Sequence, residues 1–259
     1  MSATAPSRPL AGVQDEARRI LGLARDQGIT VRLIGGTAVA QHCHGEQLPA
    51  LRRSCADIDL VVRRADQRAL RSLLQAAGYQ PDAMFNAIHG ATRLLYDDRA
   101  NGRQLDVFVG GFKMCHRLDL DDRLGLDQTT LTPADLLLTK LQVIEVNEKD
   151  LTDAASLLLW HEVADERSGD VVGIDRLIAV TSHDWGWFTT FTDNLGQAAR
   201  AAADLLPDAE AAVVQARAGQ IARAVGDARK SVRWKARARI GRHVPWYEIP
   251  EEVGGDRGR

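Results

Sequence analysis

The chain is poor in cysteine, in aromatic side chains and in long apolar segments. Its 259 residues include only 3 cysteines, an odd number without a disulfide-framework spacing, which is typical of a protein that stays in a reducing cytoplasm. No apolar run approaches the roughly 20 residues that a membrane helix needs, and the N-terminal segment MSATAPSRPL lacks the apolar stretch of a signal peptide. We therefore expect a cytoplasmic protein that does not contact a membrane.

The chain also lacks an excess of charge of one sign. Its formal net charge is −2 at pH 7, so any contact with nucleic acid requires a local basic patch. Such a patch lies between Arg217 and Arg242, where nine Arg or Lys residues face the single acid Asp227. A run of this kind is commonly a solvated helix face, but it is also a candidate for nucleic-acid contact, with a tryptophan available for stacking. The candidate binding residues are Arg229, Lys230, Arg233, Trp234, Lys235, Arg237 and Arg239.

The stretch from Val31 to Val62 contains a short apolar run, a glycine pair and two alternating aspartates. Residues 31–34 are β-branched and apolar, which predicts a buried strand, and Gly35-Gly36 predicts a tight turn into a helix that Thr37 would cap. The N-terminus of such a helix offers backbone N–H groups and a positive dipole end to an anion. We therefore expect a phosphate site at this turn.

Two predicted strands carry acids that can share one site. On a strand of period two, Asp57 and Asp59 point to the same face. A second alternating strand, residues 103–109, carries Asp106. Carboxylates this close repel one another unless a cation lies between them, and Mg²⁺ prefers oxygen ligands of this kind. Three acids beside a phosphate turn favour a metal-dependent phosphoryl or nucleotidyl transfer site.

These motifs resemble the nucleotidyltransferase superfamily related to polymerase β, and most of all its AbiEii-type toxin enzymes, over residues 15–160. The resemblance rests on Gly35-Gly36-Thr37, Arg53, Asp57-Ile58-Asp59 and Leu105-Asp106-Val107. It implies an α+β fold, with a mixed sheet and flanking helices followed by a helical C-terminal region. The catalytic core would span residues 10–132, and the mainly helical residues 133–259 would complete the site and bind RNA.

The resemblance also implies transfer of a nucleoside monophosphate from an NTP to a hydroxyl, with release of pyrophosphate. Two Mg²⁺ ions would be held by Asp57, Asp59 and Asp106, and the phosphates by Gly35, Gly36, Thr37 and Arg53. Lys140 lies on an apolar helix side and would neutralise the leaving pyrophosphate, while Asp153 of the Lys149-Asp150-x-x-Asp153 element would lie near the site. Each of these roles has an alternative. Arg53 can be a solvated loop residue, and Lys140 can extend its ammonium to solvent along an apolar surface. Asp150 and Asp153 can be acids of a first helical turn that the helix dipole favours.

The acceptor that the resemblance implies is RNA, such as a tRNA 3′ end, for a toxin with a cognate antitoxin protein. Two alternatives remain open: an aminoglycoside-type antibiotic nucleotidyltransferase, and a protein that binds nucleotide or RNA without turnover.

We predict no zinc site, cysteine nucleophile or ligand-stacking site from the remaining histidine, cysteine and aromatic residues. His42, Cys43, His44 and Cys55 include zinc-ligand types, but residues 42 and 44 of one helix do not face the same side. Cys115 and His116 are sequence neighbours, which rarely have the geometry of a thiolate–imidazole pair. Trp185, Trp187 and Phe188 are expected to pack in the interior.

Overall fold

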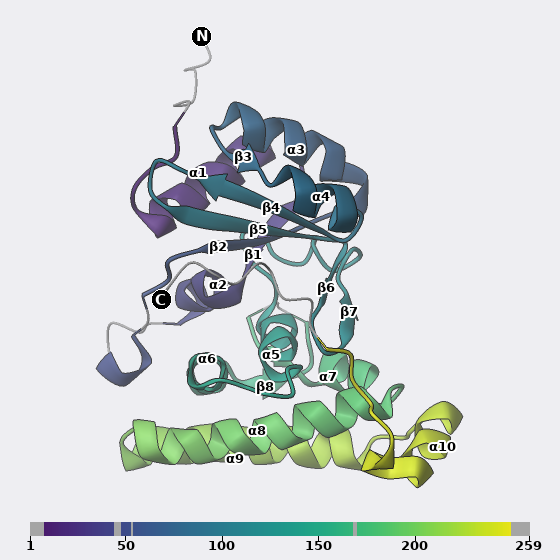
Figure 1. Ribbon diagram of the computed structural model, residues 1–259. Helices are drawn as coiled ribbons and strands as arrows, with labels where there is room; N and C mark the ends of the chain where they lie inside the picture. The colour runs from purple at the N-terminus through teal and green to yellow at the C-terminus, as the bar shows by residue number, and fades with distance from the viewer. Residues whose placement is uncertain (1–7, 44–47, 53, 168–169, 250–259) are drawn as a thin grey trace.

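The computed structural model describes residues 8–43, 48–52, 54–167 and 170–249. Its centre is a five-stranded sheet in the order β1-β2-β5-β4-β3 (Figure 1). The strands are β1 Val31–Ile34, β2 Ile58–Val62, β3 Gln80–Pro81, β4 Arg93–Asp98 and β5 Arg103–Val109. β2 and β5 run parallel, whereas the other neighbouring pairs are antiparallel. The predicted mixed sheet and α+β class are confirmed.

Helices cover both faces of this sheet (Figure 1). α1 Val13–Asp26 and α3 Gln67–Ala76 lie on one face, and the short helix α4 Ala83–His89 precedes β4. Apolar residues at helical spacing predict α1 and α3 correctly, and α1 ends before Gly28, whose φ of +70° suits glycine. The sequence does not indicate α4, which is short and depends on Asp82 accepting a hydrogen bond from the Phe85 N–H at 2.9 Å.

On the other face, α2 Gly35–His42 follows β1 without a loop. The prediction that Thr37 caps this helix is wrong. The helix begins at Gly35, the capping position is Ile34, and Thr37 lies inside the first turn, where its buried hydroxyl donates to the backbone carbonyl of Asp57 at 3.2 Å. The threonine therefore ties the helix to the residue that precedes β2.

Two helices, α5 Pro133–Leu141 and α6 Glu148–Trp160, pack beneath α2. Thr132 before Pro133 and the capping residue Asn147 predict both starts correctly: the Thr132 side chain accepts from the Asp135 N–H, and the Asn147 side chain accepts from the Asp150 N–H. Every residue of α5 is buried, because α2, α6, α7 and α8 surround it. The sequence pattern predicts a helix over residues 133–146, but α5 ends at Leu141.

The C-terminal part is helical, as expected. α7 Ile174–Thr181 leads to α8 Trp185–Leu205 and α9 Asp208–Asp227, which pack along each other, and the short α10 Val232–Ile240 lies beside α8 (Figure 1). None of the helices in the described ranges is long and apolar enough to cross a membrane.

Small elements complete the fold. The mixed sequence after Val109 predicts no regular element, but these residues form a hairpin of β6 Gly111–Lys113 and β7 Arg117–Asp119. β8 Val163–Ala164 and β9 Val172–Gly173 form a parallel pair. The sequence pattern also predicts a short edge strand at residues 128–131, where the structure has one bridge between Thr130 and Leu33. Single 3₁₀ turns occur at Pro49–Leu51, Arg64–Asp66 and Gly241–His243.

Candidate active site

The sheet register brings Asp59 and Asp106 side by side. β2 pairs with β5 so that these two residues are direct partners in the parallel ladder. Asp57 does not belong to β2, which begins at Ile58; it is exposed and its carboxylate accepts a hydrogen bond from the Gln104 N–H at 3.3 Å. The three acids named from the sequence therefore lie on or just before these two neighbouring strands, although only two of them lie within strands.

The two strand acids have different surroundings. Burial, followed by the nearby Asp106 charge, raises the pKa of Asp59 to about 7. Within the described ranges, no group donates a hydrogen bond to the Asp59 carboxylate. Asp106 instead faces Arg93 on β4, whose Nε lies 2.9 and 3.0 Å from its two carboxylate oxygens, and the Arg93 terminal nitrogen contacts it as well. Burial raises the pKa of Asp106, and Arg93 opposes this rise.

Arg93 is a site residue that the sequence analysis missed. The central carbon of its guanidinium also lies over the Phe108 ring, 4.9 Å from the ring centroid, in a cation–π contact. The only sequence signal is that Arg93 opens the otherwise apolar strand segment Arg93-Leu94-Leu95-Tyr96. That signal does not reveal which carboxylate the arginine meets.

Gly35 allows α2 to begin directly against Asp59. Gly35 has a φ of +69°, and a Cβ at this position would overlap Asp59 Oδ2 and lie 3.0 Å from Asp59 Cγ. Only glycine satisfies both the backbone angle and this close approach. Gly36 and Thr37 follow in the first turn of α2, so the positive end of the helix dipole lies next to the acid pair.

Lys140 of α5 connects the site to α6. Its ammonium is 3.0 Å from Asp150 and 2.8 Å from Asp153, and all three side chains are largely buried. Burial lowers the pKa of Lys140, but the two carboxylates outweigh this effect and the net shift is upward. The Lys140 charge also lowers the pKa of Asp59, so it acts on the acid pair. Lys140 is thus near enough to Asp59 for its charge to act on that carboxyl, and Asp153 contacts Lys140.

The negative charges at this edge of the sheet outnumber the positive ones, which favours the binding of a divalent cation. The described part of the site contains five carboxylates, those of Asp57, Asp59, Asp106, Asp150 and Asp153, and two cations, Lys140 and Arg93. Asp59 has no donor among the described groups and keeps its proton up to near neutral pH. A carboxylate with this raised pKa beside a second carboxylate fits an oxygen-ligated divalent ion. Arg53 lies outside the described residues.

The predicted nucleic-acid residues divide into two groups. Lys230 donates to the carbonyls of Gly226 and Ala228 at the end of α9, while Arg237 donates to the carbonyls of Gly241 and Val244 and stands over the Trp185 ring. Trp234 packs edge-on against Phe188. These three residues stabilise the fold around α10. The remaining four, Arg229, Arg233, Lys235 and Arg239, are exposed.

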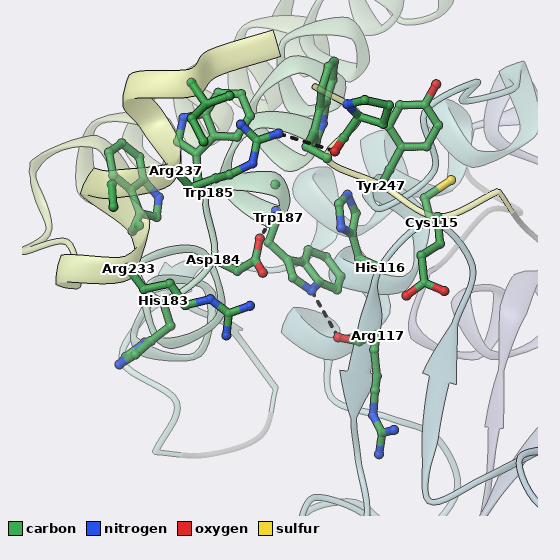
Figure 2. A pocket seen from close by; sticks show the side chains of 17 residues that line it. Cys115, His116, Arg117, His183, Asp184, Trp185, Trp187, Arg233, Arg237 and Tyr247 are labelled. Carbon is green, nitrogen blue, oxygen red and sulfur yellow. Dashed lines mark hydrogen bonds between the residues drawn. The ribbon is translucent and has the colours of Figure 1, made fainter. Parts of the chain in front are cut away.

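A cavity of about 650 Å³ separates α10 from the N-terminal end of α8 (Figure 2). Its lining includes Arg233, Trp185, Trp187 and Tyr247. As expected, Trp187 is buried, and its indole N–H donates to the Arg117 carbonyl at 3.1 Å (Figure 2). Burial lowers the pKa of His116 in this wall to about 4, so its imidazole is neutral near pH 7.

A mixed sheet with acids on two parallel strands, next to a glycine turn that opens a helix, defines a nucleotidyltransferase fold. Residues 11–196 match the sequence model of a family described as uncharacterised nucleotidyltransferase, and the chain belongs to this family. The match includes every acid of the site and ends within α8, so α9 and α10 lie beyond it. A search of curated proteins found no match.

Proposed function

We propose that the protein transfers a nucleoside monophosphate from an NTP to an acceptor hydroxyl in a Mg²⁺-dependent reaction that releases pyrophosphate. The observation that carries this proposal is the Asp59–Asp106 pair, set directly against the Gly35 turn at the start of α2. Asp57, Asp59 and Asp106 would hold two magnesium ions. When bound, Mg²⁺ supplies positive charge to phosphate oxygens and to the attacking hydroxyl.

The residues around the acids have distinct proposed roles. Gly35, Gly36 and Thr37 place the N-terminus of α2 where it attracts the β- and γ-phosphates. Lys140 offsets charge that develops on the leaving pyrophosphate, and Asp150 and Asp153 keep it protonated and fix its position. In this arrangement the helical residues 133–259 complete a site whose proposed magnesium ligands belong to residues 10–132.

Arg93 prepares Asp106 for its role. The guanidinium opposes the rise in the pKa of Asp106 that burial causes, so it favours the charged form that a cation would bind. Two N–H donors on one carboxylate also fix its orientation relative to Asp59. We assign Arg93 as a positioning residue for the acid pair.

The acceptor that we propose is RNA, with a tRNA 3′ end as the first candidate, as in the AbiEii-type toxin enzymes that the chain resembles. The support is the exposed Arg233, Lys235 and Arg239 on α10 together with the aromatic cavity beside this helix. An aminoglycoside acceptor remains the alternative, since it needs no basic helix. A toxin role further requires an antitoxin, and an adjacent gene that neutralises toxicity would support it.

Activity is tested with α-labelled NTPs, Mg²⁺ and total tRNA. Wild-type protein is expected to transfer label to RNA, while Asp59→Asn and Asp57→Asn abolish transfer and leave the circular dichroism spectrum unchanged. A parallel reaction contains an aminoglycoside as the acceptor in place of RNA. NTP binding without pyrophosphate release under all these conditions would contradict the enzyme proposal and support a non-catalytic binding protein.

RNA contact by α10 is tested through salt dependence. Changing Arg233, Lys235 and Arg239 together to Gln should reduce the log–log salt slope of RNA binding by about two units, because each single-strand phosphate contact contributes roughly 0.7. The control changes three exposed arginines of the sheet half of the molecule, Arg25, Arg68 and Arg99, to Gln. Equal slopes for wild type and the α10 variant would show that this helix is a solvated face.

A further inference from the structure

Two histidines and an aspartate from three separate segments meet at the end of α2 that lies away from the acid pair. His42 is the last residue of α2, His161 directly follows α6, and Asp170 precedes β9. One ligand atom from each of them lies within 4.8 Å of the others. We propose that His42, His161 and Asp170 form a binding site for a transition-metal ion of the Zn²⁺ class, separate from the magnesium ligands.

The two imidazoles are held in place by neighbouring groups. His161 Nδ1 is 3.3 Å from the Leu157 carbonyl, to which it donates, and this leaves Nε2 facing the Asp170 carboxylate at 3.6 Å. His42 Nε2 is 2.6 Å from the Thr130 hydroxyl and 3.1 Å from the Leu131 carbonyl. A backbone carbonyl on one ring nitrogen fixes the tautomer and the orientation of the other, which is the usual support of a metal-binding histidine.

The relative placement of the rings suits a shared ion. Their centroids are 5.3 Å apart and their planes are inclined by 69°, so they do not stack face to face. Zinc bonds of about 2.0–2.2 Å place tetrahedral ligand atoms roughly 3.3 Å apart, so binding draws the three groups together by about 1.5 Å at most. The Asp170 side chain, which is 86% exposed, has the freedom for this movement, while His161 is buried and supplies the fixed part.

The donor set selects the class of metal. Two imidazole nitrogens and one carboxylate favour zinc and related transition metals, whereas the all-oxygen set at Asp57, Asp59 and Asp106 favours magnesium. Three protein ligands leave the remaining coordination to water on the exposed side. The two sites would therefore fill independently from a mixture of both ions.

Such an ion would connect two helices whose N-terminal parts border the candidate active site. α2 begins at Gly35 against Asp59 and ends at His42, and α6 begins near Asp150 and Asp153 and ends just before His161. The two helices already pack against each other. A metal at their far ends would hold this packing together without contacting a substrate, and it would be a structural ion.

The test is zinc binding to protein that has been freed of metal with a chelator. We expect wild type to bind one Zn²⁺ per chain in calorimetry, to give the visible spectrum of tetrahedral Co²⁺, and to gain thermal stability with zinc in excess Mg²⁺. Asp170→Asn should weaken zinc binding at least tenfold while leaving the metal-free melting temperature unchanged, because Asp170 is exposed. Asp165→Asn, an exposed acid of the same segment, is the matched control and should bind zinc like wild type.

Two further variants locate the ion. His42→Gln should weaken zinc binding to a similar extent, and Asp59→Asn should leave it unchanged even though it abolishes transfer. The proposal fails if wild type binds no zinc, if Asp170→Asn binds it as tightly as wild type, or if binding is lost with Cys43→Ser but kept with His42→Gln. None of these readouts depends on nucleotidyl transfer, so they separate this inference from the proposed activity.

Discussion

Replacing Asp59 by Asn should stabilise the metal-free protein, and the gain should depend on pH. The pKa of Asp59 rises from its ordinary 3.8 to about 7 in the folded protein, mainly through burial and then through Asp106. Well below pH 3.8 the carboxyl is protonated in both states and has no effect on stability. As the pH rises further, the unfolded chain loses this proton while the folded protein keeps it, so the unfolding free energy falls until the pH passes about 7.

The size of this effect follows from the pKa difference. A difference of about 3 units at about 1.36 kcal/mol per unit is a cost of about 4 kcal/mol above pH 8. Asparagine has the same shape without the charge. We therefore expect Asp59→Asn to raise the unfolding free energy by about 2–4 kcal/mol at pH 8, a rise in melting temperature of roughly 5–10 °C.

The assay is denaturant unfolding with a chelator present, at pH 4 and at pH 8. The gain should be small, about 0.5 kcal/mol, at pH 4 and full at pH 8. Asp57→Asn is the matched control, because Asp57 is exposed, and it should shift stability by no more than about 0.5 kcal/mol. A loss of stability in Asp59→Asn at pH 8, or the same gain at both pH values, would refute the assignment of Asp59 as an uncompensated carboxylate that awaits a cation.

The other acid and its neighbours have different expected outcomes. Asp106→Asn should lower the unfolding free energy by about 2–4 kcal/mol, since it leaves the Arg93 guanidinium without its partner, and a gain in stability would contradict this pairing. Gly35→Ala should destabilise the protein by more than Gly102→Ala, because both positions have positive φ but only the first has a neighbour in the way; equal losses in thermal melts would show that backbone angle alone matters. Lys140→Ala should weaken NTP use strongly and Lys140→Arg partly, measured as kcat/KM, and wild-type kinetics in the alanine variant would leave only a packing role.

Local patterns in the sequence predicted the elements that present the acids. Alternating apolar residues predicted the strands that carry Asp59 and Asp106, and capping residues predicted the starts of α5 at Thr132 and of α6 at Asn147. Periodicity and helix capping act over a few residues, so they can be read without a partner segment. The same patterns wrongly predicted that Thr37 caps α2. Its hydroxyl donates instead to the carbonyl of Asp57, 20 residues away in the chain.

Only the tertiary structure decided which charges meet. Arg93 reaches Asp106 because β4 pairs with β5, Lys140 meets Asp150 and Asp153 because α5 packs on α6, and the register of β2 on β5 sets Asp59 beside Asp106. The grouping of His42 with His161 and Asp170 likewise joins segments more than 100 residues apart in the chain. Residue identity states what a side chain can bind, but its partner depends on strand register and helix packing, which are long-range properties of the folded chain.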